Sequence, residues 1–233
     1  MKYTHLSRVK QRKNLFIIGA VALLAIVITV VVLIAVLVSR RKHSSPQPNV
    51  ALFNLPAAVT PPSGQKLKLV YLGYGINYDH PCLIIGTQNY TCNATSGSYP
   101  PVDTAEAVLL DLTPYYTETI APSTIPPIQD LQVVGRHFYV PNPVGPGASL
   151  PSFKDRGGFV VGKRNNSVPS SRPEFSVPSV LLANVQPGKG GGSLANWVVR
   201  TDVDGGVVPA QQQKCAAGDA VAIPYRATYL FFS

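Results

Sequence analysis

The stretch 66–72 reads Lys66-Leu67-Lys68-Leu69-Val70-Tyr71-Leu72 and alternates with a period of two. Successive side chains of a β-strand point to opposite faces, so this pattern predicts a strand with one face buried. Comparable β-like runs recur as far as Thr228-Tyr229-Leu230-Phe231-Phe232, one residue before the end of the sequence. The segment from residue 65 onwards is therefore expected to be rich in strands.

The runs between these two are short and are separated by Gly, Pro and Asn residues. They cover residues 105–112, 137–140, 158–161, 196–200 and 220–223. The composition of 105–112 also suits a helix, but no segment after residue 65 shows a sustained helical stripe, and the chain's 22 prolines would interrupt most helices. The pattern predicts a mainly β domain over residues 65–233, built as an antiparallel sandwich or barrel.

Upstream of this domain, residues 15–38 form a run of 24 residues with no charge, no proline and one glycine. As a helix they would extend about 36 Å, slightly more than the hydrocarbon core of a bilayer. A cleaved signal peptide has a shorter apolar region, of about 7–15 residues, and a small-residue cleavage site. A buried core helix rarely holds an uninterrupted run of this length. The sequence therefore predicts one transmembrane helix, with the lipid bilayer as its partner.

Basic residues flank this run and predict its orientation. Residues 1–14 hold five of them and predict a cytoplasmic tail, while Arg40, Arg41 and Lys42 follow the run. The rest of 39–64 is rich in Pro and Ser and predicts a semi-extended stalk. The C-terminal domain is then expected to be extracellular or lumenal. Three N-glycosylation triplets support that side of the membrane, at Asn89, Asn93 and Asn165.

The formal net charge of +9 does not indicate a nucleic-acid partner. Eight of the 20 basic residues lie in residues 1–43, which contain no acidic residue. Residues 44–233 hold the other twelve against eleven acidic residues, a net charge of +1. The excess charge belongs to the membrane flanks, so the domain lacks the basic surface that binding to DNA or RNA requires.

Three cysteines, Cys82, Cys92 and Cys215, would lie in an oxidising compartment. Cys92 could pair with Cys215 over a long loop or with Cys82 over a short hairpin, and spacing alone does not decide. No C-x-x-C or H-x-x-x-H spacing predicts a metal site, and no motif predicts a cofactor.

Four polar residues are the candidates for chemistry. His137 lies beside aromatic residues at an expected strand start, where a packed histidine is the more common case. Asp202 and Asp204 could form a carboxylate pair near Arg200, although the segment Asp204-Gly205-Gly206 is also typical of a hairpin turn. A calcium loop would need further ligands downstream.

Several of these segments resemble the domain of unknown function 3455 family, which is common in secreted fungal proteins and occurs in bacteria. The stretch 86–92, Gly-Thr-Gln-Asn-Tyr-Thr-Cys, is similar to the family signature, and so are the stretches around 135–139, 166–169, 199–206 and 215–232. The resemblance covers about residues 56–232. It implies a disulfide between Cys92 and Cys215, where the family's two recurring cysteines fall.

The chain departs from that family in two places. Family members begin with a cleaved signal peptide, whereas this sequence predicts an anchor. Residues 76–85, which include Cys82, look like an insertion. Some members are labelled malate dehydrogenases, but Gly73-Tyr74-Gly75 is not followed by the third glycine of a nicotinamide-binding turn.

These observations favour a non-enzymatic module at the membrane surface that contacts cell-wall glycan or a surface protein. The alternative hypothesis is a hydrolase-like enzyme that uses His137, Arg200, Asp202 or Asp204.

Overall fold

The computed structural model describes residue 29 and residues 47–74, 86–100, 104–116, 127–186 and 193–233. Within these ranges no helix is both long and apolar enough to cross a membrane. The predicted transmembrane helix over residues 15–38 lies outside them except for residue 29, and the cytoplasmic tail over residues 1–14 and Cys82 lie wholly outside them.

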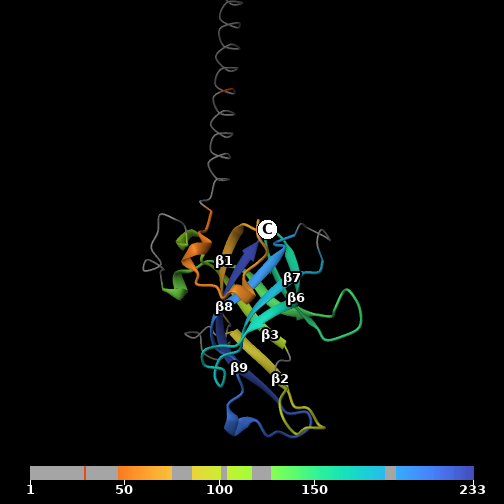
Figure 1. The fold of residues 1–233 in the computed structure, drawn as a ribbon. Coiled ribbons are helices and arrows are strands. Elements are labelled where there is room, and N and C mark those ends of the chain that lie inside the picture. Colours follow the sequence, from red (N-terminus) through yellow and green to blue (C-terminus); the bar gives the residue numbers. More distant parts are fainter. Residues whose placement is uncertain (1–28, 30–46, 75–85, 101–103, 117–126, 187–192) are drawn as a thin grey trace, which may run out of the picture. The chain divides into compact units, whose positions relative to one another are not determined.

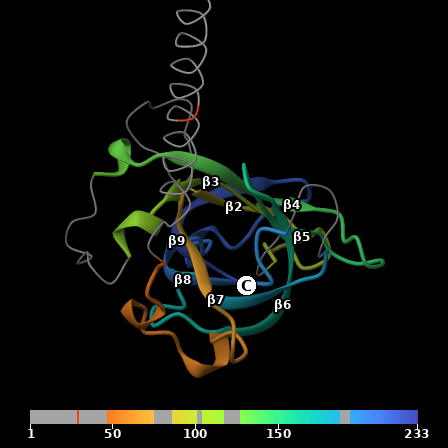
Figure 2. The same ribbon diagram turned by 90° about the horizontal axis from the view of Figure 1, so that it is seen from above.

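The described residues form nine antiparallel strands, which close into a barrel (Figure 2). Their bounds are β1 (Leu67–Tyr74), β2 (Gly86–Thr91), β3 (Thr104–Asp111), β4 (Val133–Val140), β5 (Leu150–Asp155), β6 (Phe159–Val168), β7 (Ser179–Asn184), β8 (Trp197–Gly205) and β9 (Ala220–Phe232). Each strand from β4 to β9 pairs with the next, and pairing of β3 with β4 completes the ring. The prediction of a mainly β antiparallel domain is confirmed, in its barrel form.

The ring has eight positions, because β1 and β2 share the one between β3 and β9. On β3, Tyr74 lies opposite Val108 and Thr87 lies opposite Glu106, which leaves one residue of β3 for Gly86. Pairing with β9 has the same continuity. Residues 75–85 therefore separate two halves of one strand position whose register is uninterrupted, which is the register expected around an insertion.

Alternation along the strands separates two apolar cores. At the end of β9, Ala227, Tyr229 and Phe231 point into the barrel, whereas Leu230 and Phe232 belong to the core on its outer surface. Both faces of this strand are buried, which explains its almost continuous apolar sequence. The stretch 104–111, whose composition also suited a helix, is strand β3 with the same two-sided burial.

The outer core is covered by residues 47–64, and here the structure differs from the predicted stalk. Val59 is fully buried, and the Phe53 ring stacks on Tyr116 at a centroid distance of 4.6 Å. The Asn49 amide donates to the Tyr116 carbonyl at 2.7 Å. The compact unit consequently extends over Pro46–Ser233. The segment is not extended throughout, since it contains two short 3-10 helices, Val50–Leu52 and Ala57–Val59. Its Pro-rich composition did not reveal that apolar residues between the prolines pack on the barrel.

A disulfide joins Cys92, just after β2, to Cys215, just before β9. The two connected segments lie together at the bottom of Figure 1, where Ser98 also forms a β-bridge with Lys214. The Cys92–Cys215 pairing implied by the family resemblance is confirmed.

Deleting residues 75–85 should preserve the fold and raise the melting temperature. The deletion joins Tyr74 directly to Gly86 in the register that both flanking strands already hold, and removing a closed loop of this length recovers about 2 kcal/mol of closure entropy. Thermal unfolding followed by circular dichroism measures the change.

A deletion of residues 75–84 is the matched control. It leaves one extra residue in the strand, which forces a bulge or turns every following side chain to the opposite face. This control should melt well below the 75–85 deletion; equal melting temperatures would contradict the register argument.

Candidate functional site

A cavity of about 250 Å³ lies in the barrel and is lined by residues of strands β4 to β9. Its lining comprises His137, Tyr139, Ala148, Ser149, Leu150, Pro151, Phe153, Arg164, Val180, Leu182, Arg200 and Tyr229. Ala148, Ser149 and Arg164 are exposed, whereas Phe153 and Tyr229 are almost completely buried. The cavity therefore runs from the surface into the interior core.

Strand alternation places Arg200 inside the barrel. On β8 it lies two residues after Val198, which belongs to the interior core, and one residue after Val199, which belongs to the outer core. A charged residue thus points into the barrel from β8, directly after three apolar residues of the same strand. Burial leaves only 7% of Arg200 exposed.

The Arg200 guanidinium has few partners for a buried charge. Its Nη2 donates to the Pro178 carbonyl at 2.9 Å, and the Tyr229 hydroxyl accepts a further hydrogen bond from it. Its Nε is buried and has no hydrogen-bond partner among the residues that the structure describes. Among the residues that the structure describes, no carboxylate forms an ion pair with Arg200 or with Arg164.

His137 is packed beside Arg200 as a neutral ring. It is 2% exposed and stacks on Phe153 at a centroid distance of 4.4 Å and an angle of 11°. Its Nδ1 donates to the Ser152 carbonyl at 3.0 Å, which leaves Nε2 as the acceptor. Burial lowers the pKa of His137 to about 4, and the nearby Arg200 charge acts in the same direction while the Ser152 hydrogen bond opposes it.

Tyrosine hydroxyls surround the same region. The Tyr225 and Tyr229 hydroxyls are hydrogen-bonded at 2.9 Å, and the Tyr90 hydroxyl donates to the Gly206 carbonyl. Burial raises the pKa of Tyr90 and of Tyr229 to about 12, and it raises the pKa of Tyr225 as well. These phenols are therefore uncharged at neutral pH and cannot compensate the charge of Arg200.

The carboxylate of Asp155 meets an inward tyrosine, Tyr71, but is already engaged. Asp155 Oδ2 accepts from the Tyr71 hydroxyl at 2.6 Å, and its Oδ1 accepts from the Gly157 and Gly158 amides at 2.6 and 2.9 Å. These bonds fix the turn between β5 and β6 against β1, so Asp155 serves to hold the barrel end.

Asp202 does not reach the cavity. It lies at a bulge in the pairing of β8 with β9, with a φ of 48°, and its side chain is exposed. Partial burial of the carboxyl group raises the pKa of Asp202, against a hydrogen bond from Thr228 that lowers it.

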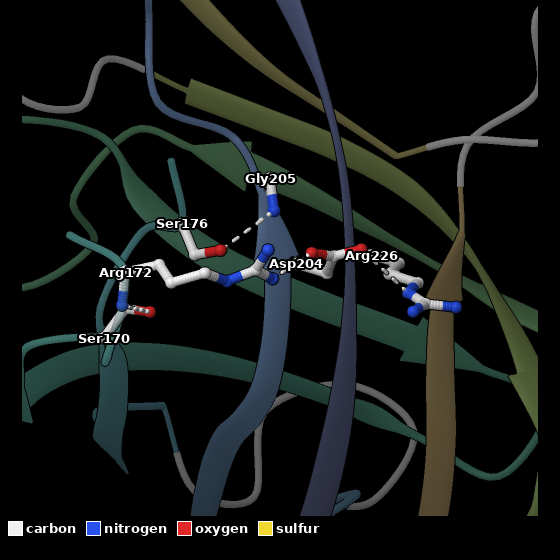
Figure 3. A network of polar contacts seen from close by, with 6 residues as sticks. All are labelled: Ser170, Arg172, Ser176, Asp204, Gly205 and Arg226. Atoms are coloured by element: carbon white, nitrogen blue, oxygen red, sulfur yellow. Dashed lines mark hydrogen bonds and ion pairs between the residues drawn. The ribbon is translucent and has the colours of Figure 1, made fainter. Parts of the chain in front are cut away.

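Asp204 does not line the cavity either, and it lies in a surface network (Figure 3). Its Oδ1 is 2.6 Å from Arg172 Nη2, and its Oδ2 is 3.4 Å from Arg226 Nε. The hairpin turn predicted at Asp204-Gly205-Gly206 is wrong, because β8 continues through Gly205, which pairs with Tyr225. Gly205 and Gly206 have positive φ, and a Cβ on Gly205 would lie 2.5 Å from the Pro224 carbonyl oxygen.

Of the four predicted polar residues, the structure brings His137 and Arg200 together and separates them from Asp202 and Asp204. Sequence reasoning missed Phe153, Tyr139 and Arg164. The inward direction of Arg200, already among the candidates, could have been inferred from its position two residues after Val198, but Arg164 lies in a run of exposed polar residues and gives no such signal. No group of three or more potential metal ligands occurs in the described ranges.

The fold and the cavity define a small antiparallel β-barrel with an interior pocket that contains a buried arginine. The chain belongs to the DUF3455 family, a protein family of unknown function whose model matches residues 62–233. The resemblance inferred from the sequence is thereby confirmed. No curated protein and no solved structure matches the chain.

Acidification should destabilise the protein between pH 6.5 and pH 4. His137 binds a proton at about pH 6.5 when unfolded but only at about pH 4 when folded, so the unfolded state carries more protons in this window. The resulting loss is about 3 kcal/mol by pH 4, and it is absent above pH 6.5. Urea denaturation at several pH values measures it, and the His137→Gln variant should show a shallower dependence. An identical slope in the variant would contradict the assignment.

Proposed function

We propose that this protein is a non-enzymatic binding module, held at a membrane surface by residues 15–38, whose barrel takes up a small molecule in the cavity around Arg200. The cavity carries the proposal. It combines apolar walls with a few convergent polar groups, the composition typical of small-molecule sites. At about 250 Å³ it suits a compound with a single ring, since a benzene ring occupies a cavity of roughly 150 Å³.

The hydrolase alternative needs a carboxylate near His137. Asp204 is instead paired with two surface arginines, and Asp202 is exposed at the bulge. His137 itself is a weak base at neutral pH, because its pKa is lowered to about 4. The residues present therefore support binding better than acid–base chemistry.

The proposed orientation has a cytoplasmic N-terminus and an extracellular or lumenal barrel. A disulfide between Cys92 and Cys215 favours an oxidising compartment. A cell-wall glycan or surface protein is too large for the cavity, so such a partner would contact the outside of the barrel.

Filling the mouth of the cavity tests the binding proposal. Ala148 lines the cavity and is exposed, so Ala148→Trp should block entry without disturbing the core. Fluorine NMR of a fluorinated single-ring fragment set, with the full chain in lipid nanodiscs, should find fragments whose lines broaden with the wild type and not with this variant.

Ala210→Trp is the matched control, because Ala210 is exposed and lies outside the cavity. Broadening that survives in both variants, or that is absent from the wild type, would overturn the proposal.

Glycosylation tests the proposed orientation. Asn93 and Asn165 are exposed, whereas Asn89 is half-buried in β2 between β3 and β9. When the full chain is expressed in a secretory eukaryotic host, glycosidase treatment should lower its mass, and Asn93→Gln and Asn165→Gln should each remove one glycan. Asn89→Gln should change little. A chain with no glycan at any of the three positions would contradict a lumenal barrel.

A further inference from the structure

We infer that the ligand of the barrel is a small aromatic or branched apolar carboxylate, whose carboxylate group pairs with Arg200 at the end of the cavity. This inference rests on the proposed function and names the class of its ligand.

The buried charge of Arg200 is the first reason to expect an anionic ligand. Arg200 is 7% exposed, its Nε has no hydrogen-bond partner in the described part of the chain, and the described groups around it include a neutral histidine and protonated tyrosines. A buried guanidinium without a counter-charge loses its hydration and regains little of it from one carbonyl and one hydroxyl. An entering anion would supply the missing counter-charge.

The geometry of the Arg200 guanidinium indicates the shape of the anion. A guanidinium presents N–H groups in a planar fork, and a carboxylate matches two of them at once. The Nε–H of Arg200 is unused, while one Nη2 proton is committed to the Pro178 carbonyl. A carboxylate can accept from Nε and from a neighbouring Nη proton without displacing that bond.

The cavity walls indicate the chemistry of the rest of the ligand. The walls beside Arg200 are formed by the Phe153, His137 and Tyr229 rings and by apolar residues of β5 and β7. These surfaces favour a ring or a branched apolar group over a sugar or a phosphate ester, whose polar atoms would find few partners there.

The charge at the mouth of the cavity favours the entry of an anion. Arg164 lies at the exposed end of the same cavity, and no acidic residue is part of the lining. Two positive charges along one path attract anions and raise their rate of association.

The test compares 4-fluorobenzoate with its neutral analogue 4-fluorobenzamide, using the full chain in nanodiscs and empty nanodiscs as the background. Fluorine line broadening should show the benzoate bound at least tenfold more tightly than the benzamide. Arg200→Met keeps the side-chain length and removes the charge, so it should abolish this preference. Arg164→Met, at the exposed mouth, should weaken benzoate binding severalfold.

Arg136→Met is the control, because Arg136 is exposed on β4 and does not line the cavity. Benzoate should raise the melting temperature of the wild type and of this control but not of Arg200→Met. Arg200→Met should itself melt no lower than the wild type, since it removes an uncompensated buried charge.

The outcomes separate the two proposals. Equal binding of both probes, blocked by Ala148→Trp, would overturn the carboxylate inference and leave the binding pocket standing. Tight benzoate binding that persists in Arg200→Met would also overturn it. Absence of binding by either probe and by the wider fragment set would overturn both.

Discussion

Hydrogen bonding along β9 is the constraint on which the rest of the barrel depends. On one side this strand pairs with β2 and then β1 along nearly its whole length, and on the other its Tyr225–Phe232 part pairs with β8. Because its register fixes which side chains point inward, it determines both the interior core and the position of Tyr229 in the cavity. The disulfide pins the start of β9 to the end of β2, at the end of the barrel away from the Trp197–Phe232 pair.

The inward face combines an apolar core with a polar cluster that is costly to bury. Replacing buried charged groups by apolar residues of similar volume is often neutral or stabilising, so a buried arginine is not required for packing alone. The presence of Arg200, His137 and the tyrosines at the end of an open cavity is what distinguishes this barrel from a barrel that is merely packed. Gln88 is fully buried, and neither of its side-chain amide atoms has a hydrogen-bond partner among the described residues, so the polar character of the interior extends beyond the cavity lining.

Sequence periodicity predicted the strands well and the enclosing architecture incompletely. The apolar alternation of 66–72 and of 228–232 identified β1 and the end of β9, because both strands have regular backbone and buried neighbours. The sandwich and the barrel share that local pattern, and only the pairing of β3 with β4 distinguishes them. The turn prediction at Asp204-Gly205-Gly206 was wrong for a related reason. The positive φ of these glycines allows a close approach to Pro224 within a strand, and an Asp-Gly pair in the sequence does not distinguish this geometry from a hairpin turn.

The cavity illustrates the corresponding limit for function. Its lining comes from six strands and one connecting segment, so no motif contiguous in the sequence records it. Local chemistry made Asp202 and Asp204 the more visible candidates, since two carboxylates two residues apart resemble a catalytic pair. The bulge at Asp202 disrupts the alternation that would have kept them with Arg200 on one face, and Arg172 and Arg226 then hold Asp204 at the surface. Separation of these carboxylates from Arg200 is therefore a consequence of strand geometry, and it leaves the buried guanidinium without a carboxylate partner among the described residues, so that an entering molecule would meet two positive charges, Arg164 at the mouth and Arg200 inside.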